Sequence, residues 1–383
     1  MKLLVLLSRF PHPLDKGDKL RAFHQIAELA RRHQITLCAL SHSRVSAQAI
    51  AALSAHCDRI EVVRVGPLRA ARGVLEALVT GLPLQVGYFL SASAWRKVEA
   101  LVADVRPDRV LCQLVRTAEY ARRLDVPVVF DYMDAFSWNL KQRAALQPAL
   151  LGFLQRLEAK RLARYEADLV GRFLSSSITS TQDREQIAHP NRSSISIVGN
   201  GVDFDTFQPR ATRKQYDLLF VGNMAYMPNV LAAEQLVREV LPRIRRERPC
   251  SVLIAGSTPS ARVRRLAGNG VTVTGWVDDI GASYASARVF VAPLPIGTGV
   301  QNKLLQALAM EMPCVTSEPP RRALGAGDDE IWVGANADEI ADRTALLLRD
   351  PDRAAELGRR GRAFALEHFQ WSATAAAWEA LWA

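Results

Sequence analysis

Short apolar runs alternate with longer amphipathic segments along the whole chain. The runs predict buried strands, and apolar residues that recur every three or four positions between them predict helices. The predicted strands of the first half are 2–7, 35–40, 59–65, 109–112, 126–130 and 173–176, and those of the second half are 218–221, 252–255, 271–274, 289–292 and 313–316. Strands separated by helices predict parallel sheets with helices on both faces, on which ligands bind at the carboxyl ends of the strands.

A polar stretch divides this pattern into two halves. Asn200 and Gly201 predict a turn, residues 209–214 form a polar linker, and a new strand pattern starts near Asp217, so we expect a domain boundary between residues 198 and 212. The closing segment 371–382 carries three tryptophans, and a helix so apolar needs a partner surface. We therefore expect an α/β protein with two Rossmann-like, doubly wound domains facing a central cleft. These are residues 1–200 and 201–367, and a C-terminal helix within 368–383 would cross back to the first domain.

The segment 289–316 holds the strongest chemical signal. An apolar strand is followed by Gly297 and Gly299 and then by an amphipathic segment, which predicts a helix beginning at Gly299 or Val300 with Lys303 in its first turn. The first N–H groups of a helix and the positive end of its dipole attract anions, whereas a cation there opposes the dipole. The combination favours a phosphate site, and a glycine loop that only reverses the chain is the alternative.

Other glycine loops follow predicted strands of the second half. Gly222, Gly256 and Gly275 each come directly after or close to the end of one strand, and several such loops at one sheet edge indicate a nucleotide site. None of them fits the Gly-x-Gly-x-x-Gly fingerprint or a P-loop. The sequence therefore argues against nicotinamide and ATP sites.

Two loops of the first half carry further candidates. Lys16, Gly17 and Arg21 come after the first predicted strand, where a glycine lets the backbone approach an anion and cations surround it. Asp131 and Asp134 follow the fifth predicted strand, where a carboxylate is either a helix cap or a catalytic group.

Composition narrows the class of protein. A chain of 383 residues with 49% hydrophobic content can bury large cores. Its apolar runs are too short to span a bilayer, and the run at the amino terminus is interrupted by Arg9, so it predicts a first strand rather than a signal peptide. The five cysteines are scattered and form neither a disulfide framework nor a zinc motif, which predicts a reducing cytosolic compartment.

The positive charge is concentrated in the first half. Residues 1–200 carry 28 Lys and Arg against 18 Asp and Glu, a net charge of +10, while residues 201–383 carry 21 of each. This asymmetry predicts a polyanionic partner, either nucleic acid or an acidic membrane surface. Arg69 and Arg72 lie beside apolar residues of the segment 67–89, which predicts either a helix lying on anionic lipid or an ordinary helix that covers a sheet.

These motifs resemble the retaining glycosyltransferases of family 4, which have the two-domain GT-B fold. The matching segments are NGVD (200–203), GNMAYMPN (222–229), TGWVDD (274–279) and PLPIGTGVQNKLLQALAMEMPCVTS (293–317). The last of these, with FDYMDAFS (130–137) and FQWSATAAAWEALW (369–382), is similar to sugar transferases associated with bacterial exopolysaccharide export systems. Thr298 and Gln306 stand where the family usually has two glutamates, and Met224 and Asn229 stand where Arg and Lys are common.

The resemblance implies hexose transfer, with retention at the anomeric carbon, from a UDP- or GDP-type nucleotide sugar to a glycan linked to polyprenyl diphosphate. It implies no cofactor and no metal ion. Catalytic roles fall to Asp131, Asp134 and Lys303, and a loop facing the acceptor or the phosphates falls to Lys16, Gly17 and Arg21. The resemblance assigns the donor site to one set of residues in the second domain: Gly222, Asn223, Met224, Asn229, Gly256, Trp276, Val277, Gly299, Val300, Gln301, Asn302, Lys303 and Gln306.

Charge and acceptor together predict a cytoplasmic protein that associates peripherally with the anionic inner face of the cell membrane and does not bind nucleic acid. Two alternatives stay open. A nucleotide-sugar 2-epimerase shares the two-domain architecture, although the sequence shows no clear histidine and carboxylate set for proton transfer. A basic nucleic-acid-binding protein would explain the charged first half but leaves the glycine loops of the second half without a purpose.

Overall fold

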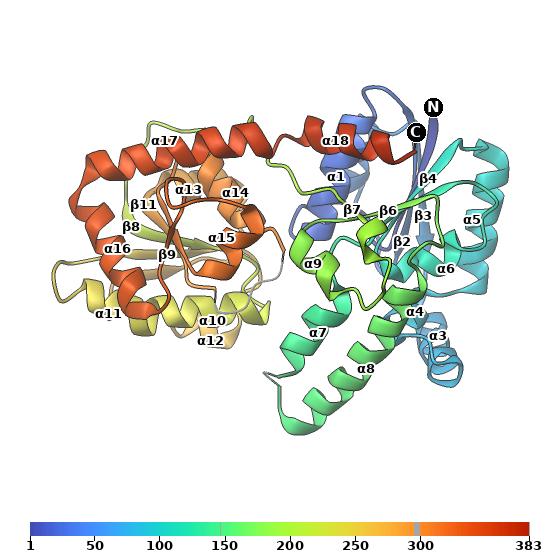
Figure 1. Ribbon diagram of the computed structural model, residues 1–383, viewed down its shortest axis with the longest axis horizontal. Helices are drawn as coiled ribbons and strands as arrows, with labels where there is room; N and C mark the ends of the chain where they lie inside the picture. The colour runs from blue at the N-terminus through green and yellow to red at the C-terminus, as the bar shows by residue number, and fades with distance from the viewer. Residues whose placement is uncertain (146, 295–298, 383) are drawn as a thin grey trace. The chain divides into compact units, whose positions relative to one another are not determined.

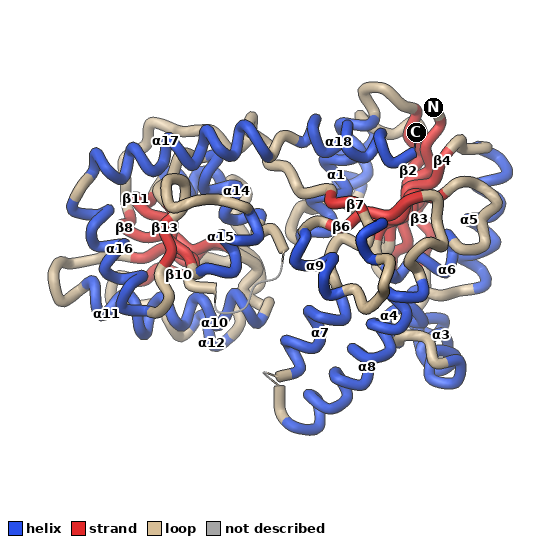
Figure 2. Tube along the Cα trace, in the orientation of Figure 1, coloured by secondary structure: helices blue, strands red, loops and turns tan. Residues whose placement is uncertain are grey.

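The computed structural model describes residues 1–145, 147–294 and 299–382 (Figures 1 and 2). The chain forms two compact units, each with its own parallel sheet. Unit 1 comprises Met1–Gly199 and Trp371–Ala383, and unit 2 comprises Asn200–Gln370.

Unit 1 is built on a parallel sheet whose strand order in the described residues is β3-β2-β1-β4-β5-β6-β7. The strands are β1 (Lys2–Leu7), β2 (Gln34–Ser41), β3 (Arg59–Arg64), β4 (Arg109–Gln113), β5 (Val128–Asp131), β6 (Ser175–Ile178) and β7 (Ser196–Ile197). Every residue of β1 after Lys2 is buried, because helices cover both faces of such a sheet. The strand order reverses between β1 and β4, and sheets of this type bind ligands beside the carboxyl ends of such strands.

Two helices of unit 1 form a long hairpin that extends away from the sheet (Figure 1). These are α7 (Phe136–Ala144) and α8 (Ala149–Asp168). The other helices are α1 (Gly17–Leu29), α2 (Ala47–Ser54), α3 (Pro67–Thr80), α4 (Leu84–Phe89), α5 (Ala92–Val105), α6 (Ala118–Ala121), α9 (Thr181–Gln186) and α18 (Trp371–Glu379), with short 3-10 turns at Val115–Thr117, Arg192–Ser194 and Ala380–Trp382.

Unit 2 has a second parallel sheet, with the order β10-β9-β8-β11-β12-β13 in its described residues. Its strands are β8 (Tyr216–Val221), β9 (Val252–Ala255), β10 (Val271–Val273), β11 (Ala287–Ala292), β12 (Cys314–Thr316) and β13 (Trp332–Val333). Its helices are α10 (Met227–Gln235), continued by a π-helical turn (Leu236–Val240) into α11 (Leu241–Ile244), then α12 (Ala261–Arg264), α13 (Ile280–Ala285), α14 (Asn302–Ala309), α15 (Glu318–Leu324), α16 (Ala337–Arg349) and α17 (Pro351–His368).

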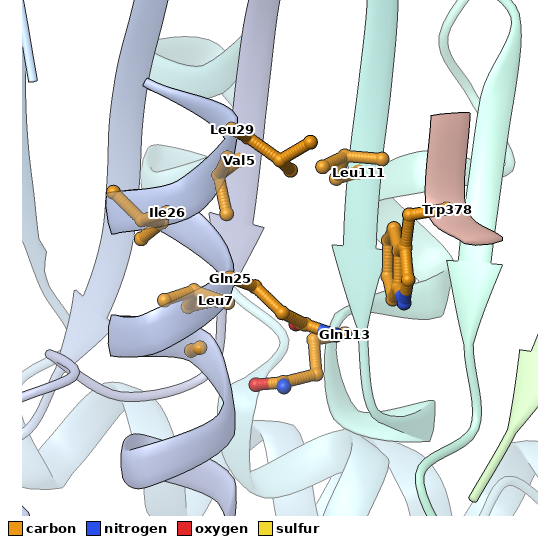
Figure 3. Close-up of a pocket in the computed structure, with 9 residues that line it drawn as sticks. Val5, Leu7, Gln25, Ile26, Leu29, Leu111, Gln113 and Trp378 are labelled. Atoms are coloured by element: carbon orange, nitrogen blue, oxygen red, sulfur yellow. The ribbon is translucent and has the colours of Figure 1, made fainter. Parts of the chain in front are cut away.

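The closing helix α18 packs against α1 within unit 1 (Figure 1). Its tryptophan rings are buried: Trp371 stacks on His24 with ring centroids 5.0 Å apart, and Trp378 is 2% exposed. Figure 3 shows Trp378 facing a small, mostly apolar cavity, together with Gln25 of α1 and Gln113 of β4. The sequence-based expectation that the C-terminal helix crosses back to the first domain is therefore confirmed.

The predicted strands recur in the structure with small shifts. The strand predicted at 173–176 begins two residues too early. Phe173 packs on the core before the strand, and β6 itself is Ser175–Ile178. β7 and β13 were missed, since two residues are too short for a periodic pattern. None of the helices in the described residues is both long enough and apolar enough to cross a membrane.

Candidate active site

Two glycine loops meet at the carboxyl edge of the unit 2 sheet. Gly222 follows β8 and Gly256 follows β9, the neighbouring strand. Gly256 has φ +134°, and a Cβ atom there would lie 2.0 Å from the carbonyl oxygen of Gly222. Only glycine allows this approach of the two backbones, so the loops are held close to each other at the edge where parallel sheets bind ligands.

The helix that follows β11 begins later than predicted. It starts at Asn302, with Gln301 as the N-cap, rather than at Gly299 or Val300. Gly299 has φ +72°, a conformation that interrupts a helix, which is the physical reason for the shift. Gly297 and Thr298 lie outside the described residues.

Lys303 is the second residue of this helix, and its ammonium group turns into the unit. Its Nζ donates a hydrogen bond to Asn229 Oδ1 and lies 5.1 Å from the centroid of the Phe220 ring. Burial lowers the pKa of Lys303 to about 7, because an ammonium group loses hydration there. Lys303 therefore lies near its titration point at neutral pH, and an approaching anion would favour its charged form.

Asn229 links Lys303 to the glycine loop. Its Nδ2 donates to the carbonyl oxygen of Asn223 at 2.9 Å, and a Cβ atom on Gly222 would lie 2.7 Å from that same nitrogen. Asn229 is 5% exposed, so its side chain positions the loop and the lysine rather than offering a free contact surface. The Asn223 side chain accepts a bond from Ala225 N and stabilises the turn.

The next turn of α14 carries Gln306. Tyr284, which is fully buried, donates its hydroxyl to Gln306 Oε1 at 3.0 Å and lies 3.1 Å from the carbonyl oxygen of Lys303. A side-chain amide both donates and accepts, so Gln306 can bind a sugar hydroxyl while it contacts Tyr284. Asn302, at the helix start, accepts a 3.0 Å bond from Asn200 of the NGVD segment.

Trp276 and Val277 lie in the loop after β10. Trp276 is 56% exposed, and its Nε1 donates to Asp278 Oδ1 at 2.9 Å, which fixes the indole and leaves a ring face in solvent. Asp279 caps α13 by accepting from Ala282 N and pairs with Arg210. Within the described residues, no group of three or more His, Cys, Asp or Glu side chains is arranged to hold a metal ion.

Met224 does not fit the role predicted for it. Its side chain is 0% exposed and belongs to the core of unit 2, because the loop after β8 turns this residue inward. Its backbone N–H and carbonyl instead bond to Ser257 and Ser260 in the neighbouring loop. The expectation that the Met224 side chain contacts a donor is wrong.

In unit 1 the structure brings Arg21 and Asp131 together in the interior. Arg21 Nε donates to Asp131 Oδ2 at 2.7 Å, and both side chains are fully buried. The guanidinium also donates to the carbonyl oxygens of Val198 and Gly199, and Asp131 accepts from Ser177. The assignments of Arg21 to a phosphate-facing loop and of Asp131 to the reacting sugar are therefore corrected: the pair ties α1, β5 and the segment after β7 to one another.

Asp134 is placed differently from Asp131. It is only partly buried, accepts a 3.0 Å bond from Asn139, and lies near the guanidinium of Arg116. Desolvation, reinforced by Asp183 and Glu166, raises the pKa of Asp134 to about 7. This carboxyl can exchange a proton near neutral pH, as a catalytic group requires.

Cations gather beside Asp134. Arg116 follows β4 and donates to Gln85 at 3.0 Å, and burial lowers its pKa to about 10. Burial and the charge of Arg9 lower the pKa of both Arg116 and Lys16, so Arg9 lies near both of these cations. Lys16 and Gly17 are exposed at the start of α1. The sequence pattern did not indicate Arg9 and Arg116 as site residues, although both follow strands that end at the switch point of the sheet.

Comparisons with known proteins bear on both units. Residues 215–350 match a family model described as glycosyl transferases group 1, and this range contains the glycine loops and Lys303. The GDP-mannose-dependent alpha-(1-6)-phosphatidylinositol monomannoside mannosyltransferase of Mycobacterium tuberculosis is 29% identical over 227 residues, which cover 51% of this chain and 57% of that protein. The chain thus spans little more than half the length of this curated relative.

Solved structures with a similar fold cover nearly all of the chain. Sucrose-phosphate synthase from Thermosynechococcus elongatus has a TM-score of 0.70 at 16% identity, covering 100% of this chain and 98% of that chain. Anabaena HepE in complex with UDP and glucose has a TM-score of 0.70 at 12% identity, covering 98% of each chain. With the two parallel-sheet units, these similarities show that the fold is GT-B, which confirms the predicted fold class.

Proposed function

We propose that the protein is a retaining, metal-independent glycosyltransferase that moves a hexose from a UDP- or GDP-sugar to a lipid-linked glycan. The observation that carries the proposal is the connected group in unit 2, in which Asn229 joins the Gly222 loop to the Lys303 ammonium. Such a group suits a diphosphate, because it combines backbone N–H donors with one titratable cation. The family model matched by residues 215–350 supports a transferase, and the M. tuberculosis relative is named for GDP-mannose and a phosphatidylinositol acceptor.

In this proposal the diphosphate lies over Gly222, Asn223 and the first turn of α14. The exposed ring of Trp276, with Val277, would bind the base, and Gln306 would bind the ribose in place of the usual glutamate. Departure of the nucleotide leaves negative charge on the β-phosphate, and prearranged N–H groups with the Lys303 ammonium would stabilise that charge in the transition state.

Unit 1 would bind the acceptor. Asp134, whose pKa is raised to about 7, is the carboxyl we assign to the reacting sugar, and the exposed Lys16 and Gly17 would contact phosphate or acceptor groups. The acceptor we propose is a polyprenyl-diphosphate glycan used in bacterial exopolysaccharide or cell-surface polysaccharide synthesis. An acceptor of this kind stays in a membrane, so the protein would act at the inner face of the cell membrane.

The test is transfer from a panel of UDP- and GDP-sugars to a lipid-linked acceptor, followed by anomeric analysis of the product. Lys303→Ala is expected to lower kcat about 100-fold, as loss of one transition-state donor does. Lys214→Ala is the matched control, because this lysine of unit 2 precedes β8 and bonds to Ala285 O, away from the glycine loops.

Two outcomes would contradict the proposal. Equal turnover by the Lys303→Ala and Lys214→Ala variants would remove Lys303 from the reaction. A new nucleotide sugar formed from donor alone, with no acceptor present, would make the protein an epimerase.

A further inference from the structure

An apolar face on α8 is left open to solvent. Its members lie in the first half of the helix: Leu150, Leu151, Phe153, Leu154 and Leu157, with exposures of 75%, 46%, 52%, 53% and 43%. At 3.6 residues per turn these positions fall within an arc of about 160°, so they form one continuous surface, here called the α8 face. Monomeric soluble proteins rarely leave such a contiguous apolar surface in water, and those that do use it for binding.

The α8 face is not a loosely packed core. The opposite side of α8 packs tightly on α7, since a Cβ atom on Gly152 would lie 2.6 Å from the carbonyl oxygen of Ala144. Glu158, on the buried side, accepts a 3.2 Å bond from the backbone N–H of Gln85 at the start of α4. Rotating α8 to bury its leucines would expose this packed side, so the fold itself directs the α8 face outward.

The hairpin carries an excess of positive charge. Residues 136–168 contain six Lys and Arg against three acidic residues. Glu158 and Glu166 are buried, and Asp168 at the end of α8 pairs with Arg122 and Arg172. Lys160 and Arg164 are exposed and continue the α8 face toward the body of the unit. With a rise of about 1.5 Å per residue, the apolar part is about 10 Å long and the basic side chains lie directly behind it. A helix that binds the surface of an anionic bilayer places its apolar groups at the acyl boundary and its cations at the headgroups. The α8 face and the basic side chains behind it have this arrangement.

A second exposed apolar helix belongs to the same part of unit 1. On α3, Leu68 is 86% exposed and Val79 is 89% exposed, and Arg69 and Arg72 are also in solvent. α3 packs on α4 through glycines, where a Cβ atom on Gly73 would lie 2.1 Å from the carbonyl oxygen of Gly87. Since Gln85 of α4 also donates to Glu158 of α8, both apolar helices contact α4.

We propose that the α7–α8 hairpin is a membrane-docking element whose α8 face inserts into the interface of an anionic bilayer, with Lys160 and Arg164 at the phosphates and α3 as a second contact. The positive charge of the hairpin selects this occupant over a second copy of the chain, which would bring like charges together. The inference rests on the proposed function in one respect, because it names the surface through which the transferase would reach a lipid-linked acceptor.

The experiment is flotation of the full-length protein with vesicles of phosphatidylcholine alone or of phosphatidylcholine with 30% phosphatidylglycerol. Wild type should float with the anionic vesicles. The double variant Phe153→Ser, Leu154→Ser should lower the partition coefficient at least about tenfold and remove the part of binding that resists salt. Its control, Ile50→Ser with Leu174→Ser, changes two other exposed apolar residues of unit 1 and should change binding less than about twofold.

Charge reversal tests the second component of docking. Lys160→Glu with Arg164→Glu should abolish the preference for anionic over neutral vesicles, since each basic group near anionic lipid changes binding about fivefold. Arg264→Glu with Arg265→Glu alters the net charge of the chain equally on exposed positions of unit 2, and it should retain that preference. Unaltered melting temperatures would show that all four double variants are folded.

Several results would overturn the inference. Wild-type protein that stays unbound with anionic vesicles, or control pairs that lose binding as much as the hairpin pairs, would exclude the docking role. A dimer in light scattering that the Phe153→Ser, Leu154→Ser variant makes monomeric, with vesicle binding intact, would assign the α8 face to self-association. Duplex binding that depends on Lys160 and Arg164, without vesicle binding, would assign the hairpin to nucleic acid.

A separate measurement distinguishes this inference from the proposed function. The rise in melting temperature with a UDP- or GDP-sugar, measured without vesicles, should be the same for the hairpin variants and for wild type. Vesicle binding without any shift by a nucleotide sugar would refute the proposed function and leave the docking surface in place.

Discussion

The contact of Lys303 with Asn229 and the Phe220 ring places a lysine near its titration point at neutral pH. In the free protein its pKa is about 7, so the ammonium is mostly charged at pH 6 and mostly neutral at pH 8.5. A bound diphosphate favours the charged form, and binding therefore takes up a proton above pH 7. Donor affinity should fall as pH rises through 7, with log Kd rising by up to one per pH unit.

Titration calorimetry at pH 6 and pH 8.5 measures this directly. A nucleotide sugar is the right ligand, because its diphosphate is esterified at both ends and does not titrate in this range. Lys303→Met should bind more weakly at pH 6 and show little pH dependence. The same slope in the variant as in wild type would assign the titration to another group.

Gly256 provides a second test at the residue scale, since it has φ +134° and lies against the backbone of Gly222. Gly256→Ala should lower the free energy of unfolding by about 2 kcal/mol or more, because the Cβ atom meets backbone that must move. Gly275→Ala is the matched control: nothing lies within 4 Å of its Cβ position, and its φ is not in the left-handed region. Urea denaturation of the two variants compares them, and equal losses would mean that the close approach of the loops is not tight in solution.

The sequence predicts which residues come together around the proposed donor site better than it predicts where their side chains point. Lys303 is identifiable from its place after a glycine loop, but its inward direction depends on Asn229, 74 positions away. Arg21 looks like a loop cation because it follows Gly17, whereas its partner Asp131 lies 110 positions further on. Pairings at such separations arise from the sheet topology, which a local pattern does not contain.

At the scale of elements, α18 is the clearest case of a segment whose composition demands a partner. Trp378 is 2% exposed and packs between α1 and the sheet of unit 1. Trp378→Ala should lower the free energy of unfolding by about 3 to 5 kcal/mol, through lost burial and the cavity left behind. Trp276→Ala removes the same side chain from a position 56% exposed and should change stability by less than about 0.5 kcal/mol.

The measurement is calorimetric melting of both variants, with deletion of residues 371–383 as a third sample. The deletion should be at least as destabilising as Trp378→Ala, since it also uncovers the surfaces under Trp371 and Trp382. A truncated chain with the same melting temperature as wild type would show that α18 is dispensable for unit 1.

Elements with a plain periodic pattern could be predicted, and elements defined by their surroundings could not. β1 and β9 have the predicted bounds because β9 and all of β1 after Lys2 are continuous apolar runs that are buried. In α8 the leucines recur at helical spacing, a pattern that suggests a helix facing the core. The leucines near its start nevertheless face solvent. Periodicity identifies an apolar face but does not say whether protein or lipid covers it.

At the scale of the whole molecule, the two proposed tasks, donor binding and membrane docking, fall on different units. Unit 2 holds the linked glycine loops and Lys303, and unit 1 holds the basic region near Asp134 and the hairpin with the α8 face. The net charge of +10 lies in residues 1–200, while residues 201–383 are neutral. Under the two proposals the donor and the membrane bind different units, and each should alter a different part of the chain.

Hydrogen exchange on the full-length protein measures the protection of both units in one experiment. A nucleotide sugar should slow exchange in peptides that cover 222–229, 256–260 and 299–306, because a bound anion occupies or stabilises the N–H groups of these loops. Peptides from 150–164 should not change with the donor. Anionic vesicles should give the reverse result, with slower exchange in 150–164 and in 67–80, because an amphipathic helix exchanges more slowly when lipid covers it. Donor protection confined to unit 1, or vesicle protection confined to unit 2, would contradict the assignment of the two tasks. Lys303→Met should remove the protection by the donor without altering the protection by vesicles.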